Sequence, residues 1–278
     1  MICQDGGMNA QVLVGTGSSL LRRGWRHALL VGIVVGSFVA MMMMEKFGQD
    51  VGYHDFADRR AVLGIPNFSD VMSNLPFLLV GIFGVVACVR KEGEPMRVAW
   101  VVFFTGVGLV ALGSAYYHWE PWNGTLVWDR LPMTIGFMGL FVALLGESVS
   151  VRLGKVLLLP ALLVGFASVI YWHRTDDLRF YSWVQLIPLL AVPTFLVLFR
   201  SGYSHQWLLL VALGCYVSAK VAEAHDVEVF RFTGGRFCGH SLKHLLAACG
   251  CCAILVMVKK RRRVAGGGSR GDAELVRG

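Results

Sequence analysis

The run VAWVVFFTGVGLVALGSAYYH at residues 98–118 is apolar along most of its length and ends in polar side chains. About 20 apolar residues are enough for a helix to cross the hydrocarbon core of a bilayer. The run therefore predicts a membrane-spanning helix with Ser114 and His118 in its last turns. Ionisable side chains are costly inside a span and usually face the interior of a bundle, which makes His118 a candidate functional residue.

Similar apolar runs recur along the chain, and the composition agrees with them. Of the 278 residues, 55% are hydrophobic and 16% are charged, and the mean hydropathy is +0.60, which is outside the usual range for soluble domains. The runs show no period of two, so they are not the strands of a barrel. The sequence predicts an all-α polytopic membrane bundle with eight spans, near residues 25–44, 70–90, 98–118, 129–147, 153–172, 181–199, 206–223 and 238–258.

The first apolar run follows three arginines, as a secretory signal peptide would. However, no small-residue cleavage site follows it, and its apolar core is long for a signal. We therefore expect a retained helix. The predicted organisation is a cytoplasmic leader at 1–24, an extra transmembrane helix at 25–44, a seven-helix domain at 45–258 and a basic, disordered cytoplasmic tail at 259–278.

Lysine and arginine are more numerous in the loops on the side of the two termini than in the opposite loops. This excess predicts that both termini are cytoplasmic. The net charge of +8 then reflects topology, and no nucleic-acid partner is expected. The run KKRRR at 259–263 is expected to contact anionic lipid headgroups. The seven cysteines form no CxxC pair and no spaced zinc framework, so they are assigned no chemistry.

Polar residues from three spans are expected to meet near the non-cytoplasmic face. Ser114 and His118 are four residues apart, as are His240 and His244, so each pair lies on one helix face. Asp129 begins the span between them. Three imidazoles with an open fourth position form the ligand set of a catalytic zinc. Haem fits less well because His240 and His244 face the same way. A packed or interfacial role remains the alternative for each histidine alone.

Three short segments resemble a known family. SAYYH at 114–118, WDRLPM at 128–133 and HSLKH at 240–244 resemble, in order and spacing, the alkaline ceramidases of the CREST superfamily of seven-helix membrane hydrolases. The segment NFSDVMSNLPFLLVG at 67–81 resembles the first core helix of those enzymes. The resemblance extends over about residues 50–258 and implies a core of seven helices, with the first span as an addition at the N-terminus.

The resemblance also implies a function. Ceramidases cut the amide of ceramide to release a sphingoid base and a fatty acid. Carried over to this chain, the zinc ligands fall on His118, His240 and His244, and the catalytic serine and aspartate on Ser114 and Asp129.

Alkaline ceramidases also bind calcium through an acidic N-terminal loop, and this chain departs from that pattern. The corresponding loop offers Asp55 and Asp58 beside two arginines, and Asn67 stands where a further acid is expected. Because calcium takes about six to eight oxygen ligands, Asp55 and Asp58 are incomplete as a calcium site.

A second departure is the segment that precedes the last span, in which Glu223, His225 and Asp226 have no counterpart. A lysine inside a span should be paired, so Glu223 is a candidate partner for Lys243. The alternative is that Lys243 extends to the membrane interface.

The expected chemistry is proton transfer by Asp129, with Ser114 donating a hydrogen bond to the developing oxyanion or to the attacking water. A serine nucleophile is the competing mechanism, but His118 cannot both ligate zinc and act as the base for Ser114. Two other functions remain open. One is a lipid-binding receptor, since the adiponectin and progestin receptors share this constellation, and the other is a hydrolase of another lipid.

Overall fold

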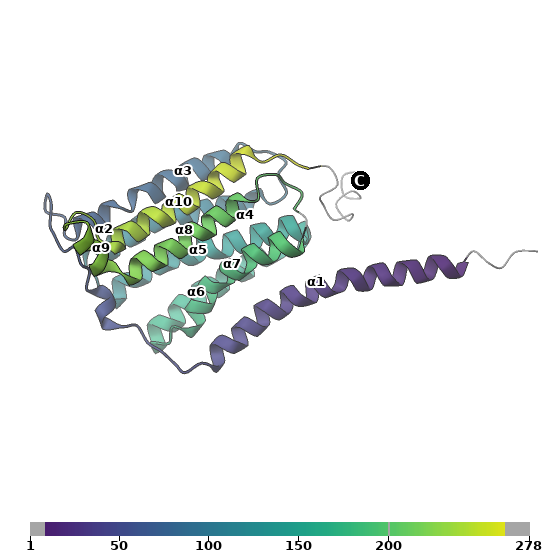
Figure 1. The fold of residues 1–278 in the computed structure, drawn as a ribbon, viewed down its shortest axis with the longest axis horizontal. Helices are drawn as coiled ribbons and strands as arrows, with labels where there is room; N and C mark the ends of the chain where they lie inside the picture. Colours follow the sequence, from purple (N-terminus) through teal and green to yellow (C-terminus); the bar gives the residue numbers. More distant parts are fainter. Residues whose placement is uncertain (1–8, 200, 265–278) are drawn as a thin grey trace, which may run out of the picture.

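The computed structural model describes residues 9–199 and 201–264 (Figure 1). Over these ranges the chain is mainly helical and contains no strand, so the predicted all-α bundle is confirmed. The helices are α1 (Asn9–Met43), η1 (Val51–His54), α2 (Phe68–Met72), α3 (Leu75–Val89), α4 (Arg97–Trp119), α5 (Asn123–Ser148), α6 (Val151–Thr175), α7 (Arg179–Leu198), α8 (Leu208–Ala224), α9 (Asp226–Phe232) and α10 (Gly239–Lys260).

The described part of the chain contains seven spans that are long and apolar enough to cross a membrane, so the protein is an integral, multi-pass membrane protein. α2 and α3 together form one of these spans. The predicted run at 206–223 corresponds to α8, which has only 17 residues. α8 meets α9 at an angle of 85°, and this bent pair is the eighth candidate span.

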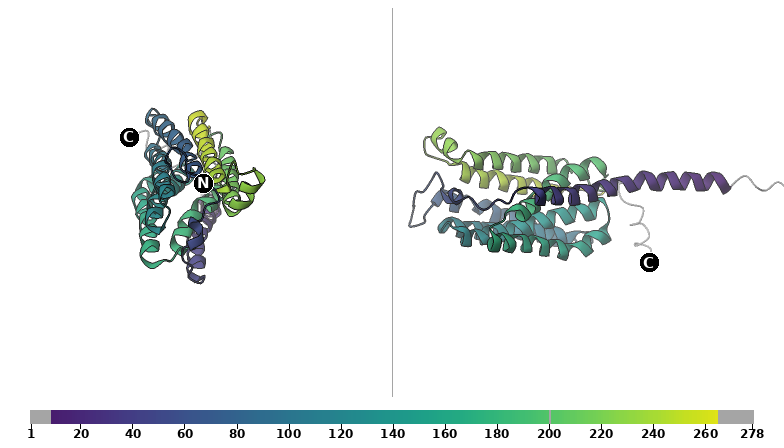
Figure 2. Two further views of the ribbon diagram at one scale, coloured as in Figure 1. Left: turned by 90° about the vertical axis from the view of Figure 1, so that its left-hand side faces the viewer. Right: turned by 90° about the horizontal axis from the view of Figure 1, so that it is seen from below.

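Helix α1 stands apart from the other helices. It lies along one side of the bundle and continues beyond it at one end (Figures 1 and 2). Its main contact is with α7, where the rings of Phe38 and Trp183 lie 5.0 Å apart and the Trp183 indole donates a hydrogen bond to Ser37. α1 begins at Asn9, inside the predicted leader, and residues 1–8 lie outside the described residues.

Arg179, at the start of α7, connects this helix to the end of α1 through hydrogen bonds. Its guanidinium donates hydrogen bonds of 2.9 Å to the carbonyls of Met42 and Met44. It also pairs with Asp177 and lowers the pKa of that carboxyl to about 2. Asp177 therefore stays charged at ordinary pH and holds Arg179 in place.

The first residues of the predicted tail are ordered against the bundle. Arg261 is buried and pairs with Glu147 at 2.7 Å and with Glu94 at 3.3 Å. Within the run at 259–263, Arg261 therefore pairs with carboxylates of the bundle, because a buried charge requires a partner. Contact of the basic run with lipid headgroups stays a prediction. Residues 265–278 lie outside the described residues.

Glycines bring the helices close together at one end of the bundle. A Cβ atom on Gly113 of α4 would overlap the carbonyl of Trp128 in α5, and one on Gly239 of α10 would overlap the carbonyl of Ala222 in α8. This end also holds α2, α9 and the loop that follows α1 (Figure 1). The start of α1 and the end of α10 lie at the opposite end (Figure 1).

Candidate metal centre

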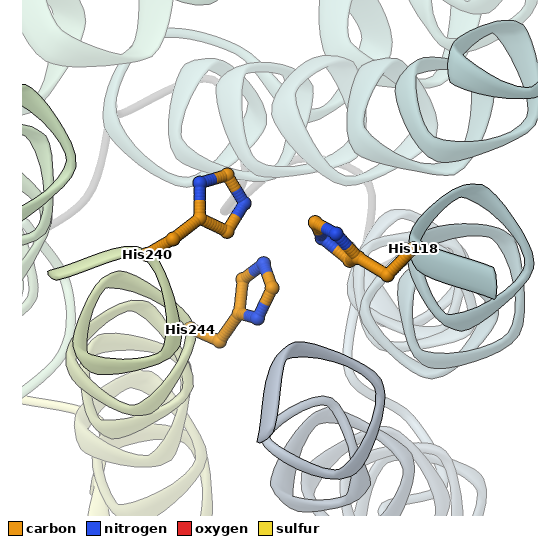
Figure 3. Close-up of side chains that lie close together, drawn as sticks. All are labelled: His118, His240 and His244. Atoms are coloured by element: carbon orange, nitrogen blue, oxygen red, sulfur yellow. The ribbon is translucent and has the colours of Figure 1, made fainter. Parts of the chain in front are cut away.

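Three histidines from distant parts of the chain meet at this end of the bundle. His118 lies in the last turn of α4, and His240 and His244 lie in the first turns of α10. Their ring centroids are 4.8 to 4.9 Å apart, and one nitrogen of each ring lies within 4.8 Å of the others. Figure 3 shows the rings turned toward a common point between the two helices.

The imidazole of His118 has no hydrogen-bond partner for either ring nitrogen among the described residues, although the side chain is only 1% exposed. An unsatisfied buried polar group costs roughly 1–3 kcal/mol. The backbone of His118 is held in place, because the side-chain amide of Asn67 donates a hydrogen bond of 2.8 Å to its carbonyl. A fixed backbone and two free ring nitrogens fit a metal ligand.

His244 is oriented by Ser73, which lies between α2 and α3. His244 Nδ1 is 2.7 Å from Ser73 Oγ, and Ser73 donates its own hydrogen to the carbonyl of Asp70. A hydroxyl has one hydrogen, so Ser73 accepts the N–H of His244 Nδ1. The Nε2 lone pair of His244 is then free for a metal, and metal-ligating histidines usually have such a partner on the other nitrogen.

His240 has a charged neighbour. The ammonium of Lys243 is 2.8 Å from His240 Nε2 and 2.9 Å from Glu223 Oε1, so the predicted pair of Glu223 and Lys243 is present. Glu223 also accepts a hydrogen bond from the hydroxyl of Tyr53. Burial, together with the charge of Glu223, raises the pKa of Tyr53, which keeps the hydroxyl protonated as a donor. Glu223 thus gives Lys243 a partner that does not depend on His240.

Asp226 joins the last span to the loop that follows α1. One carboxylate oxygen accepts the backbone N–H of His240 at 2.7 Å, and the other accepts the backbone N–H of Ala57 at 2.8 Å. The sharp turn between α8 and α9 brings Asp226 to this position. Asp226 therefore fixes the start of α10, where two of the three histidines lie.

Ser114 and Asp129 lie together beside the histidines. Both side chains are buried, and the Ser114 hydroxyl is close enough to the Asp129 carboxylate to donate a hydrogen bond to it. The close approach of α4 and α5 at Gly113 allows this contact. Ser114, Asp129 and His244 all line one cavity of about 310 Å³. The five residues predicted as the site are therefore gathered in one place.

The two candidate calcium ligands have other partners. Asp58 is 1% exposed and accepts hydrogen bonds from Arg60 and Ser69, all at 2.7 Å. The Arg60 guanidinium lowers the pKa of Asp58, so the pair is ionised at neutral pH. Asp55 pairs with Arg59 at the surface. Calcium needs several free oxygen ligands, so these residues do not fit a calcium ion.

The lipid hydrolysis that the resemblance implies is therefore expected to be independent of calcium. A calcium-selective chelator should leave the rate unchanged, because Arg60 already neutralises Asp58. The measurement is the hydrolysis rate with the chelator and with added calcium, for the wild type and for Arg60→Gln. A rate that falls with the chelator and returns with calcium would contradict this prediction.

No role was predicted from the sequence for Ser73, Tyr53 or Asp226, although Asp226 stood out as a departure from the family pattern. Ser73 lies in the span that resembles the first core helix, but a serine in a span is ordinary and gives no signal of a histidine partner. Asp226 carries a weak signal, since it is an acid at the beginning of a short helix. One of its backbone partners, Ala57, is far from it in the sequence, and the other, His240, lies across a turn. Neither contact could be predicted without the fold.

Residues 63–270 match the family described as Ceramidase. The match begins just before α2 and includes Ser114, Asp129 and the three histidines, whereas Asp55 and Asp58 precede it. No curated protein matches the chain. Because the family match covers most of the sequence and all of the candidate metal centre, the chain belongs to the ceramidase family.

Proposed function

We propose that the protein is a zinc-dependent amidase that hydrolyses ceramide-like sphingolipids to a sphingoid base and a fatty acid. Membership of the ceramidase family supports ceramide hydrolysis. The observation that carries the zinc proposal is His118, whose two buried ring nitrogens face two further imidazoles and have no hydrogen-bond partner in the part of the chain that the structure describes. His118, His240 and His244 would hold the ion.

A zinc ion held by these histidines would supply Lewis acidity, which polarises a carbonyl and makes water a better nucleophile near neutral pH. The residues of the chain do the rest. Asp129 accepts a proton from the attacking water and passes it to the amide nitrogen as the C–N bond breaks. The carbonyl carbon keeps the water oxygen as a fatty acid, and the nitrogen leaves as the amine of the sphingoid base.

Ser114 positions the carboxylate of Asp129. The hydroxyl has one hydrogen, and that hydrogen is donated to Asp129, so it is not available to an oxyanion at the same time. We therefore favour orientation of Asp129 over the oxyanion role considered from the sequence. Ser114 as a nucleophile is less favoured, because its only acidic or basic partner among the described residues is a carboxylate, and His118 belongs to the proposed metal centre.

The placement in the membrane is part of the proposal. The centre lies at the end of the bundle opposite the start of α1 and the end of α10 (Figure 1). With both termini cytoplasmic, as the loop charges predict, the substrate would be cut near the non-cytoplasmic face. Helix α1 would be retained as an addition to a seven-helix catalytic domain that begins near residue 45.

The direct test is turnover of a ceramide with a fluorescent acyl chain by the purified protein. We expect release of the labelled fatty acid, loss of activity after a strong zinc chelator, recovery with added zinc, and no effect of a serine-directed phosphonate. Absence of product from protein that contains zinc would favour a receptor. Cleavage of an ester analogue in preference to the amide would favour another lipid hydrolase. Turnover that survives complete metal removal would contradict the zinc proposal.

A further inference from the structure

Arg130 is a buried cation that the mechanism does not use. It follows Asp129 in α5, is 6% exposed and lines the cavity that reaches His244. Its guanidinium carbon lies 3.9 Å from the centre of the Trp172 ring and 4.7 Å from that of Tyr181, and Gln49 accepts a hydrogen bond from its Nη2. These contacts hold the guanidinium in a fixed orientation.

One nitrogen of this guanidinium has no partner. Arg130 Nη1 is buried and makes no hydrogen bond within the described residues. Aromatic faces attract the charge of a guanidinium but do not accept its in-plane N–H groups. A buried charge without an ionic partner is costly, so the position requires an acceptor that residues 9–199 and 201–264 do not provide.

The carboxylates around the cavity are committed elsewhere. No carboxylate among the described residues forms an ion pair with Arg130. Asp129 accepts from Ser114, Glu223 binds both Lys220 and Lys243, and Asp50 accepts from the backbone N–H of Gly52. Among the described residues that line the cavity, Arg130 is thus the one arginine or lysine without an ion pair, although its charge also acts on the neighbouring carboxylate of Asp129.

We propose that Arg130 binds an anionic group on the polar head of the lipid substrate, such as a phosphate monoester or a sulfonate. This inference rests on the proposed function, since it places a lipid amide at the histidines and the lipid head in the same cavity. A cavity of about 310 Å³ is at the lower end of the range for ligand sites. A cavity of this size suits the polar head and the amide of the substrate. The two long hydrocarbon chains would lie outside it, between the helices and the surrounding lipid.

The chemistry of the site favours an anion over a hydroxyl. Guanidinium groups bind phosphate and carboxylate through charge-assisted hydrogen bonds, which are roughly twice as strong as neutral ones. The Arg130 side chain is already oriented by Gln49, Trp172 and Tyr181, so little side-chain freedom is lost on binding. A neutral head would leave the buried charge without compensation.

The test is equilibrium binding of two analogues that cannot be hydrolysed. Both are ceramides in which a sulfonamide replaces the amide, and one of them carries a phosphate on its head hydroxyl. We expect the zinc-loaded wild type to bind the phosphate analogue about tenfold more tightly or better, as for a hydrogen bond to a charged group. Equal binding of the two analogues by the wild type would overturn the proposal, whatever the variants do.

Arg130→Gln is expected to remove this preference, and Arg130→Lys to keep part of it. Arg174→Gln is the matched control, because Arg174 is an exposed arginine at the end of α6 and does not line the cavity. A preference that persists in a folded Arg130→Gln protein would overturn the proposal. Oleate carries an anion without a sphingoid head, so binding of oleate that is as tight and as dependent on Arg130 would overturn the assignment to the head.

The outcome of this binding test can be distinguished from the outcome of the test of the proposed function. Hydrolysis of ceramide without a preference for the phosphate analogue would leave the amidase proposal intact and refute the role of Arg130. A preference that depends on Arg130, in a protein that cleaves no amide, would support the role of Arg130 and refute the amidase proposal.

Discussion

Replacing His118 with alanine is expected to remove metal binding and to lower hydrolysis by about 10³-fold or more, because metal assistance contributes several kcal/mol in the transition state. His118 is the only one of the three proposed ligands that comes from α4, so without it the site has two adjacent imidazoles of α10. Those two side chains alone hold zinc weakly, since catalytic sites keep three protein ligands. The measurements are metal content after dialysis and the rate of ceramide hydrolysis.

The matched control is His173→Ala. His173 is exposed on α6, is distant in the sequence from the three histidines, and has its ring contact with Trp172. This variant should keep both metal and activity. The ring of His118 packs on Phe56, so folding of the His118 variant is checked by thermal unfolding without metal. A folded His118→Ala protein that retains stoichiometric metal and wild-type turnover would contradict the assignment.

Asp129→Asn is expected to lower kcat by about 10²-fold to 10⁴-fold, the usual contribution of a placed acid or base, with little change in KM or metal content. The amide has the shape of the carboxylate and can still contact Ser114, but it cannot accept a proton at neutral pH. Ser114→Ala should have a smaller effect on kcat, since it removes only the group that orients Asp129.

The measurement is kcat and KM as a function of pH, with metal content determined on the same samples. The wild type should lose activity at low pH as the base is protonated, and Asp129→Asn should lose that limb of the profile. Turnover by Asp129→Asn close to that of the wild type would exclude Asp129 as the proton carrier. Loss of metal together with activity would instead assign Asp129 to the metal centre.

The spans could be predicted, as could the two helix faces that carry the pairs Ser114/His118 and His240/His244. Each of these features depends on residues near one another in the sequence. The run at 98–118 is long enough to be a span by its own composition, and the four-residue spacing of His240 and His244 places them on one face of any helix. The prediction that His118 joins them needed the alternating direction of the spans, which follows from their order along the chain, and the loop charges then indicated which side of the membrane this face is.

Contacts between distant segments could not be predicted in this way. The partner of His244 is Ser73, which lies 171 positions away at a break between two helices. The ion pair that Arg261 forms with Glu147 joins residues 114 positions apart. The bend after α8 also arises from tertiary contacts, since Asp226 holds the backbone of Ala57 and His240.

The proposed calcium independence has the same origin. Asp55 and Asp58 look like partial calcium ligands when only the residue types are read. The structure shows that Arg60 takes the place beside Asp58 that a cation would need. An intramolecular ion pair of this kind does not depend on the concentration of a free ion, whereas binding of calcium does. The loop is therefore held in place without an external ligand.

X-ray absorption at the zinc edge of the purified protein tests the central claim most directly. We predict one zinc per chain with nitrogen and oxygen neighbours at about 2.0–2.1 Å and the scattering pattern of imidazole rings, as for zinc held by histidines. The imidazole signal should be lost in His118→Ala. A shell of sulfur neighbours at about 2.3 Å, or a zinc signal that is the same in His118→Ala, would contradict the account.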